Sequence, residues 1–246
     1  MANQEAQTSS NAVTPETSKT KLKVAIDGPA GAGKSTVARR VAEELGYLYI
    51  DTGAMYRAAT LIVLRHNLPV DNNELAGKAL DESTIELLPP NDESSGRQRV
   101  MVDGIDETEN IRMREITNQA SAVSALPAVR ERLVARQRQL AERGGAVLDG
   151  RDIGTVVLPN AEVKIFLTAS AEVRANRRLK ELAESGQQVD YQVILNEMIE
   201  RDRKDSTRVL APLRPADDAI MVDTDNLSID EVVHAIISHC SKNLGN

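Results

Sequence analysis

Aromatic side chains are nearly absent from this sequence. Of its 246 residues, one is Phe, four are Tyr and none is Trp. The core must therefore consist of Leu, Ile, Val and Ala. A stacking platform for single-stranded nucleic acid is not expected, because such a platform needs several exposed rings. A hydrophobic fraction of 41% still suffices for a sizeable core, which excludes wholesale disorder.

Cysteine, long apolar runs and net positive charge are also lacking. Cys240 is the only cysteine and cannot form an internal disulfide, which favours a reducing compartment. No apolar run approaches the roughly 18 residues of a membrane span. Residues 1–20 resemble neither a secretory signal nor a transit peptide. A net charge of −7 has the wrong sign for a general binder of nucleic acids or anionic membranes. We therefore expect a soluble cytoplasmic protein in which local Arg and Lys clusters hold any anionic ligand.

Short apolar segments separated mostly by helical patterns predict an α/β fold with buried parallel strands. They are Lys23–Asp27, Tyr47–Asp51, Ala146–Asp149, Val163–Leu167 and Ala219–Asp223. Four of the five end in Asp, and acidic residues at the carboxyl ends of parallel strands line the edge where such sheets bind ligands. For Asp223 we favour a role in the following turn.

Helical patterns and one irregular stretch complete the predicted organisation. The helices are Ser35–Leu45, Gly53–His66, Arg112–Ser124, Ala128–Arg143, Ala171–Ser185, Tyr191–Thr207 and Ile229–Lys242. Residues 83–108 break this rhythm and predict a small antiparallel sheet of Thr84–Leu88, Gln98–Val102 and Ile105–Thr108. Residues 1–20 lack periodicity and read as a disordered tail, so we predict one domain, residues 21–246, with this sheet inserted.

A phosphate-binding loop is predicted between the first strand and the first helix. Residues 28–35 match G-x-x-x-x-G-K-[ST], whose glycines let the loop turn and aim backbone N–H groups at phosphate oxygens. Lys34 is expected to reach the β and γ phosphates, and the Ser35 hydroxyl to ligate Mg²⁺. The residues expected to bind the phosphates of a nucleoside triphosphate are Gly28, Pro29, Ala30, Gly31, Ala32, Gly33, Lys34, Ser35 and Thr36. The N-K-x-D motif of GTPases and the signature of ABC-type ATPases are absent.

Two further strand ends predict a second anion site. After the second strand, Thr52 can cap the following helix and offer its hydroxyl, while Arg57 adds a guanidinium. An ordinary helix cap with a surface arginine is the alternative. After the third strand, Asp149 fits a Walker-B-like carboxylate near Mg²⁺, and Arg151 and Asp152 are expected to point over the edge of the sheet.

Arginines at helical spacing predict a clamp for phosphate charge. Residues Arg201, Asp205 and Arg208 share one helix face. A second stripe consists of Arg174, Arg177 and Arg178. For Arg174 we expect a solvated charge. The others would neutralise phosphates on this acidic protein.

The motif set as a whole resembles the bacterial type of cytidylate kinases. The resemblance spans residues 22 to about 240 and is carried by IDGPAGAGKST, DTGAMYR, DGRDIGTVVLP, VKIFLTAS and ERDRKDSTRVLAPL. It implies the fold of nucleoside monophosphate kinases, which has a five-stranded parallel core, a monophosphate-binding subdomain and a mobile lid, here at about 170–208. The predicted small antiparallel sheet is similar to the one in that family.

The resemblance also implies roles for individual residues. The phosphate of CMP would be held by Thr52, Arg57 and Arg151. The cytosine would be met by Ser121, Arg130 and Asp152, with Arg208 nearby. The ribose would lie beside Arg201 and Asp205. The ATP phosphates would be faced from the lid by Arg177 and Arg178. Some relatives have Gly where this chain has Ser35, so either Ser35 or Thr36 could supply the hydroxyl for Mg²⁺.

The expected reaction is therefore transfer of the γ-phosphoryl group of Mg·ATP to CMP or dCMP. Catalysis would rest on Lys34, Arg151, Arg177 and Arg178, and the metal on Ser35 and Asp149. We expect a monomer with small-molecule substrates, no nucleic acid and no membrane partner. Two alternatives stay open: a P-loop kinase for another acceptor such as UMP or a non-nucleotide alcohol, and a non-catalytic nucleotide-dependent regulator. A regulator would have no reason to keep Arg57, Arg151, Arg201 and Arg208 together.

Overall fold

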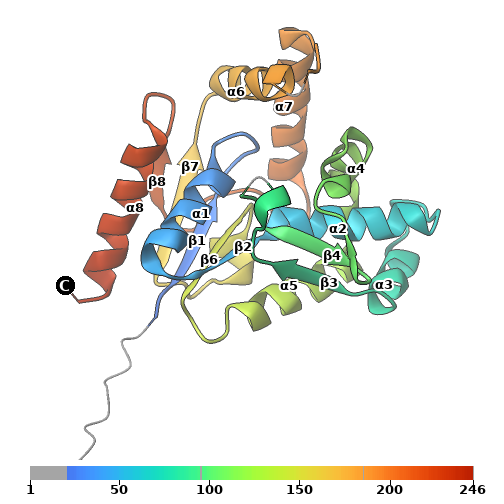
Figure 1. The fold of residues 1–246 in the computed structure, drawn as a ribbon, viewed down its shortest axis with the longest axis horizontal. Helices are drawn as coiled ribbons and strands as arrows, with labels where there is room; N and C mark the ends of the chain where they lie inside the picture. The colour runs from blue at the N-terminus through green and yellow to red at the C-terminus, as the bar shows by residue number, and fades with distance from the viewer. Residues whose placement is uncertain (1–20, 95, 185, 246) are drawn as a thin grey trace, which may run out of the picture.

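Five parallel strands form the central sheet of the structure, a computed structural model that describes residues 21–94, 96–184 and 186–245. Their order is β2-β6-β1-β7-β8 (Figure 1). The strands are β1 (Lys23–Asp27), β2 (Leu48–Asp51), β6 (Ala146–Gly150), β7 (Val163–Thr168) and β8 (Ile220–Asp223). The predicted parallel sheet is confirmed, with strand ends displaced by at most one residue. The predicted tail, residues 1–20, lies outside the described residues.

Alternate residues of the central strands enter two different cores on opposite faces of the sheet. Ala25 and Leu148 pack on one face, whereas Val24 and Ile26 pack on the other. The first face is covered mainly by α2 (Thr52–Arg65), α3 (Asn73–Asp81), α4 (Arg114–Ser124) and α5 (Pro127–Leu140). The second face is covered by α1 (Lys34–Leu45) and α8 (Ile229–Asn243), as Figure 1 shows. Burial on both faces explains why the strands read as apolar runs without alternation.

The predicted insertion forms a three-stranded antiparallel sheet. Its strands are β3 (Ile85–Leu88), β4 (Arg99–Val102) and β5 (Ile105–Asp106). Val100 and Val102 are buried in the same core as α2, so the small sheet packs on the first face of the main sheet. This part of the prediction is confirmed, although each strand is shorter than its sequence pattern suggested.

Some local elements differ from the sequence prediction. Helix α3 was not predicted, because its buried positions are mostly the small residues Ala76, Gly77 and Ala79, which leave a weak pattern. Helix α4 begins two residues later than expected, since a 3-10 turn at Asn110–Arg112 and the extended Met113 precede it. A single π-helical turn, Ile153–Val157, follows β6 and was also not predicted.

Helices α6 (Ala171–Glu184) and α7 (Tyr191–Thr207) lie together above the carboxyl ends of the strands (Figure 1). Ala175, Ile194 and Met198 form a small core between them that is separate from the two main cores. These helices coincide with the region predicted as a lid, and their movement stays a prediction. No helix within the described residues is long and apolar enough to cross a membrane.

Candidate active site

Three of the four strand-terminal aspartates meet at one edge of the sheet. Asp51 and Asp149 are paired in the β2–β6 register, and Asp27 is opposite Gly150 in the β1–β6 register. All three are buried. Asp223 is exposed, and its carboxylate accepts a hydrogen bond from the backbone N–H of Asp225 at 2.9 Å, which is the turn-forming role expected for it.

The predicted phosphate loop lies between β1 and α1. Gly28 has a φ of +146°, and a Cβ atom there would lie 2.1 Å from the backbone oxygen of Leu167, so only glycine fits. In the described chain no side chain caps the N-terminus of α1, which leaves its first N–H groups for an anion. Lys34 opens the helix, and its Nζ donates to the backbone oxygen of Pro29 at 2.7 Å.

Lys34 is held in an unusual electrostatic environment. The side chain is buried, and burial lowers its pKa well below the ordinary value of 10.5, with a further contribution from the charge of Arg151. Asp149 and Asp27 oppose this shift. A cation that is desolvated beside other cations gains most from a polyanionic ligand.

Ser35 and Asp149 form a hydroxyl–carboxylate pair beside the loop. The Ser35 Oγ donates to the Asp149 Oδ2 at 2.8 Å, and the Tyr49 hydroxyl donates to the Asp149 Oδ1 at 3.0 Å. Burial raises the pKa of Asp149 to about 6, and the charge of Asp51 adds to this effect. Oxygen ligands of this kind are the ones that Mg²⁺ prefers, so the two residues fit a magnesium ion. Of the two candidate hydroxyls, that of Ser35 contacts this carboxylate, which favours it over that of Thr36.

Thr52 does not cap α2, contrary to the prediction. The cap is Asp51, whose carboxylate accepts from the backbone N–H of Ala54 at 2.8 Å, and Thr52 is the first residue of the helix. The Thr52 hydroxyl instead donates to the backbone oxygen of Asp149 at 2.6 Å. Asp outcompetes Thr here because a carboxylate also interacts favourably with the positive end of the helix dipole.

Three of the predicted arginines converge beside the N-terminus of α2. The Arg151 Nε donates to the Asp205 Oδ2 at 2.9 Å. The Arg57 Nη1 lies beside Gly53 near the start of α2, 3.8 Å from the position that a Cβ atom on this glycine would occupy. Burial lowers the pKa of Arg201 to about 10, and the charges of Arg151 and Arg57 lower it further. Among the described residues, no carboxylate lies within ion-pair distance of Arg57 or Arg201. Arg57 and Arg201 therefore contribute a positive potential that no direct ion pair within the described residues neutralises.

A second cluster surrounds Asp152. Its Oδ2 accepts from the Arg130 Nη2, and its Oδ1 accepts from the Arg208 Nη2 at 3.4 Å. Asp152 and Arg130 are both buried, and Arg130 also lies 5.7 Å from the ring centre of Tyr56. The predicted base-side residue Ser121 is half-buried on α4, and it is its backbone that is linked to this cluster, through Ser124. The Ser121 backbone oxygen accepts from the Ser124 Oγ at 3.0 Å, and the Ser124 oxygen accepts from Arg130 at 3.4 Å.

The stripe of arginines on α6 divides differently from the prediction. Arg174 was expected to be solvated, but its side chain is only 4% exposed. Its Nη1 donates to the Ala30 oxygen of the phosphate loop at 3.1 Å, and its Nη2 donates to the Asp202 Oδ2 on α7 at 2.6 Å. Arg177 donates to Thr224 and, at 3.5 Å, to the Gly31 oxygen of the same loop. Arg178 is exposed and pairs with Glu181 one turn along the helix. The spacing alone could not tell which of these positions faces α7 and which faces solvent.

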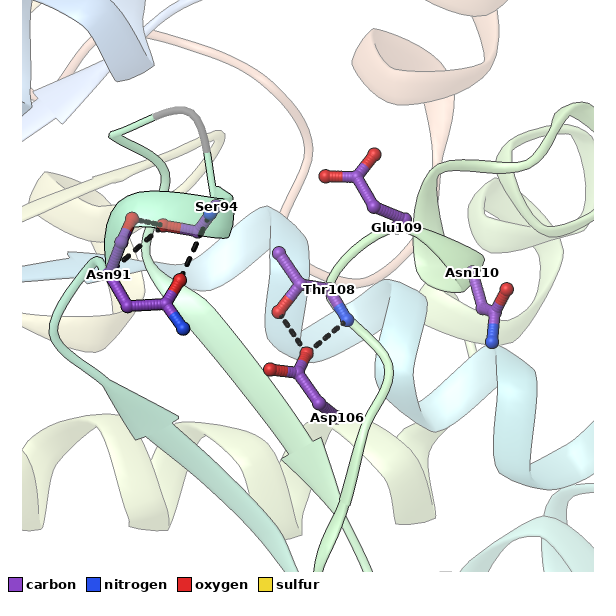
Figure 2. Close-up of a pocket in the computed structure, with 6 residues that line it drawn as sticks. All are labelled: Asn91, Ser94, Asp106, Thr108, Glu109 and Asn110. Carbon is purple, nitrogen blue, oxygen red and sulfur yellow. Dashed lines mark hydrogen bonds between the residues drawn. The ribbon is translucent and has the colours of Figure 1, made fainter.

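A separate cavity of about 180 Å³ lies at the base of the insertion (Figure 2). It is lined by Asn91, Ser94, Asp106, Thr108, Glu109 and Asn110. Figure 2 shows the Asp106 carboxylate accepting hydrogen bonds from the hydroxyl and the backbone N–H of Thr108, at 2.6 and 3.0 Å. None of the predicted site residues lines it.

Comparison with known proteins agrees with this geometry. The family model for cytidylate kinase matches residues 24–242. The chain belongs to the cytidylate kinase family. A cytidylate kinase of Streptococcus gordonii is 51% identical over 221 residues, which cover 90% of this chain and 97% of the relative. One of Bacillus subtilis is 52% identical over 217 residues, which cover 88% of this chain and 95% of the relative. The resemblance drawn from the motifs is confirmed.

Some residues at this cytidylate kinase site were missed by sequence reasoning. Tyr49 orients Asp149, Arg174 binds the phosphate loop, and Arg112 lies 3.7 Å from the Asp51 carboxylate with Arg57 nearby. Tyr49 lies in a strand and Arg112 is the first residue of a predicted helix, and at such positions tyrosine and arginine carry no distinctive pattern. For Arg174 the sequence did contain a signal, because it shares a helical stripe with Arg177, which was predicted to face the phosphates.

Asp27 links the phosphate loop to the turn after β6. Its carboxylate accepts from the backbone N–H groups of Ile153 and Gly154, at 2.8 and 2.7 Å. Those two residues directly follow Arg151 and Asp152. Burial raises the pKa of Asp27 from 3.8 to about 6, against the opposing effect of the two backbone hydrogen bonds. The Asp27 carboxylate is therefore buried, and its two backbone hydrogen bonds offset only part of the cost of its desolvation.

We predict that the substitution Asp27→Asn changes how stability depends on pH. Because the pKa of Asp27 is higher in the folded protein than in the unfolded chain, the cost of burying its charge is present above about pH 6 and is relieved as the pH falls toward about 4. Relative to the Asn variant, the wild type should gain stability over this interval, on the order of 3 kcal/mol at most. Thermal unfolding of both proteins at several pH values measures the difference. Asp223→Asn is the matched control, and parallel curves for the wild type and the Asp27 variant would contradict the prediction.

Proposed function

We propose that this chain transfers the γ-phosphoryl group of Mg·ATP to the phosphate of CMP or dCMP, giving ADP and CDP or dCDP. Membership in the cytidylate kinase family supports the class of acceptor. The observation that carries the proposal is the pair Arg57 and Arg201, which lie beside Arg151 without a carboxylate partner among the described residues. Partly buried cations of this kind suit a bound phosphate.

The donor nucleotide lies along the phosphate loop in this proposal. Backbone N–H groups of the phosphate loop and of the start of α1, together with the Lys34 ammonium, hold its phosphates. Ser35 and Asp149, 2.8 Å apart, hold a Mg²⁺ ion, which neutralises phosphate charge when it is bound. Arg177 reaches the Gly31 oxygen from α6 and so borders the loop on the lid side.

The acceptor lies between α2, α7 and the turn after β6. Thr52, Arg57 and Arg151 hold the phosphate of CMP, and Arg201 and Asp205 lie at the ribose. Arg151 and Asp205 fix each other by their hydrogen bond of 2.9 Å, so the phosphate and ribose positions are linked. The Asp152 cluster, with Ser121, Arg130 and Arg208, receives the base.

No covalent intermediate is required for this transfer. An oxygen of the CMP phosphate forms the new bond to the γ-phosphorus, and the bond from that phosphorus to the β-phosphate oxygen of ADP breaks. The protein contributes position and charge neutralisation, and a closed lid would exclude water that would otherwise be the acceptor. Lys34, Arg151 and the lid arginines Arg177 and Arg178 are the residues proposed to stabilise the transferring charge.

A coupled assay of ADP formation across CMP, dCMP, UMP, AMP and GMP tests the proposal. CMP and dCMP should give the highest kcat/KM. Higher kcat/KM with UMP would assign the chain to another acceptor. Turnover with none of the five would leave a nucleotide-dependent regulator as the better explanation.

We predict that Lys34→Ala lowers kcat by about 10³-fold while the protein stays folded, because the ammonium acts where the γ-phosphate charge redistributes. Removing a buried, desolvated cation should not destabilise the protein. Steady-state kinetics with CMP and a thermal melt measure the two effects. Lys78→Ala, at an exposed lysine paired with Glu74, is the control and should change neither. An unchanged kcat in the Lys34 variant would contradict the proposal that the phosphate loop stabilises the charge of the transferring phosphoryl group.

The geometry around Asp152 suits cytosine better than uracil. Cytosine offers an N4 amino donor with N3 and O2 acceptors, whereas uracil offers an O4 acceptor and an N3–H donor. A carboxylate accepts from the amino group, and guanidinium groups such as those of Arg130 and Arg208 donate to the acceptors. Uracil would place an oxygen against the Asp152 carboxylate and an N–H against a guanidinium.

We predict that Asp152→Asn lowers kcat/KM for CMP about a hundredfold and lowers it much less for UMP, because the variant loses the attraction for cytosine and the repulsion of uracil together. Asn is preferred to Ala here, since its side-chain oxygen can still accept a hydrogen bond from the buried Arg130, whereas Ala offers this guanidinium no acceptor. Kinetics with both monophosphates give the ratio. Equal loss on both substrates would place Asp152 in folding or in metal chemistry instead of base recognition.

A further inference from the structure

Strand β2 is an edge strand of the main sheet, and its outer side needs hydrogen-bond partners. The strand order places β6 on one side of β2 and no main-sheet strand on the other. The backbone oxygen of Tyr49 and the backbone N–H of Asp51 point to this outer side, where their partner is a side chain. Buried backbone groups without a partner are costly, so something must satisfy them.

The side chain of Gln98 supplies both partners. Its Nε2 donates to the Tyr49 oxygen at 2.6 Å, and its Oε1 accepts from the Asp51 N–H at 3.0 Å. Gln98 is 7% exposed and lies in the insertion, directly before β4. An adjacent parallel strand would offer the same pattern, one donor for the C=O of a residue and one acceptor for the N–H two residues later. The amide of Gln98 thus replaces a peptide group of a missing sixth strand.

The end of β2 that Gln98 holds carries two parts of the site. The Tyr49 side chain orients Asp149 through the hydrogen bond of 3.0 Å, and Asp51 caps α2 through the bond of 2.8 Å to Ala54. Helix α2 begins with Thr52 and bears Arg57 one turn later. A shift of this strand end would therefore displace the start of α2 with its acceptor-side residues, whereas Asp149 stays in β6 and keeps the hydrogen bond from Ser35.

We propose that Gln98 is a positioning residue by which the insertion holds the acceptor side of the site. The inference rests on the proposed CMP kinase activity, since it assigns Arg57 and Thr52 to the acceptor phosphate. A second contact of the insertion is made with α1 instead of β2: the Arg39 Nη1 donates to the Gly96 oxygen at 2.6 Å. The amide of Gln98 touches neither phosphate loop nor base cluster, so its effect on catalysis passes through Tyr49 and Asp51.

The test compares Gln98→Met, which keeps the length and removes both hydrogen bonds, with Arg39→Leu, which cuts the other contact. We expect Gln98→Met to raise the KM for CMP about tenfold and to change the KM for ATP by less than about twofold, because a small misplacement of α2 affects only the acceptor. The backbone amide of Asp51 should also exchange with deuterium faster than in the wild type. Arg39→Leu should change neither KM nor that exchange rate.

Unchanged KM values in Gln98→Met, equal rises for both substrates, or the same CMP defect in Arg39→Leu would overturn the proposal. If Gln98→Met does not fold, Gln98→Glu decides: it keeps the acceptor for Asp51 and loses the donor for Tyr49, so the same selective rise in KM is expected. Deuterium exchange at Asp51 needs no turnover. Absence of CMP phosphorylation in the wild type would therefore contradict the proposed function alone. In that case, the role of Gln98 would be contradicted only if the Asp51 amide exchanged with deuterium at the same rate in the wild type and in Gln98→Met.

Discussion

Three hydroxyl groups from the first part of the chain meet at Asp149, which lies 97 to 114 residues later in the sequence. Its carboxylate receives the hydroxyls of Ser35, from the start of α1, and of Tyr49, from β2, while its backbone oxygen receives the hydroxyl of Thr52 at the start of α2. The donor side and the acceptor side of the site are thus tied to one buried residue in β6. The same burial raises the pKa of Asp149 to about 6, which leaves its charge dependent on the cations around it.

The electrostatics of the site follow from crowding several cations onto an acidic protein. The charges of Arg151 and Arg201 lower the pKa of Lys34, and that of Arg151 also lowers the pKa of Arg201, although burial contributes more than this repulsion. Such an arrangement is unfavourable without a ligand, because the charges are desolvated and only partly compensated by Asp149 and Asp205. A nucleotide with its phosphates supplies the missing negative charge, so the arrangement is more favourable with substrate than without it.

Helix α6 contacts the phosphate loop through two arginine side chains that reach backbone oxygens of the loop. Arg174 and Arg177 on α6 donate to the oxygens of Ala30 and Gly31, and Arg174 also pairs with Asp202 on α7. Because a backbone oxygen is present whatever residue occupies the position, these contacts depend on the shape of the loop and leave its N–H groups free for phosphate. The position of α6 and α7 and the shape of the loop are coupled by these arginines.

The sequence by itself determined the class of this protein. The parallel strands, the inserted sheet and the loop ending in Lys34 and Ser35 follow from local patterns, since apolar runs, glycines and turn residues act on their immediate neighbours. The motif set also identified the family and named Arg57, Arg151 and Asp152 as site residues. Helix α3, built on small buried residues, left too weak a pattern to be recognised.

Only the tertiary structure decided what individual polar side chains contact. Arg174 and Arg178 are four residues apart on the same helix, yet one is buried against the phosphate loop and the other is exposed. Gln98 has no motif, and its role exists because an edge strand happens to lie beside it. Asp51 instead of Thr52 caps α2. A polar side chain can satisfy its hydrogen bonds in many ways, and which partner it takes depends on residues that are distant in sequence and adjacent only after folding.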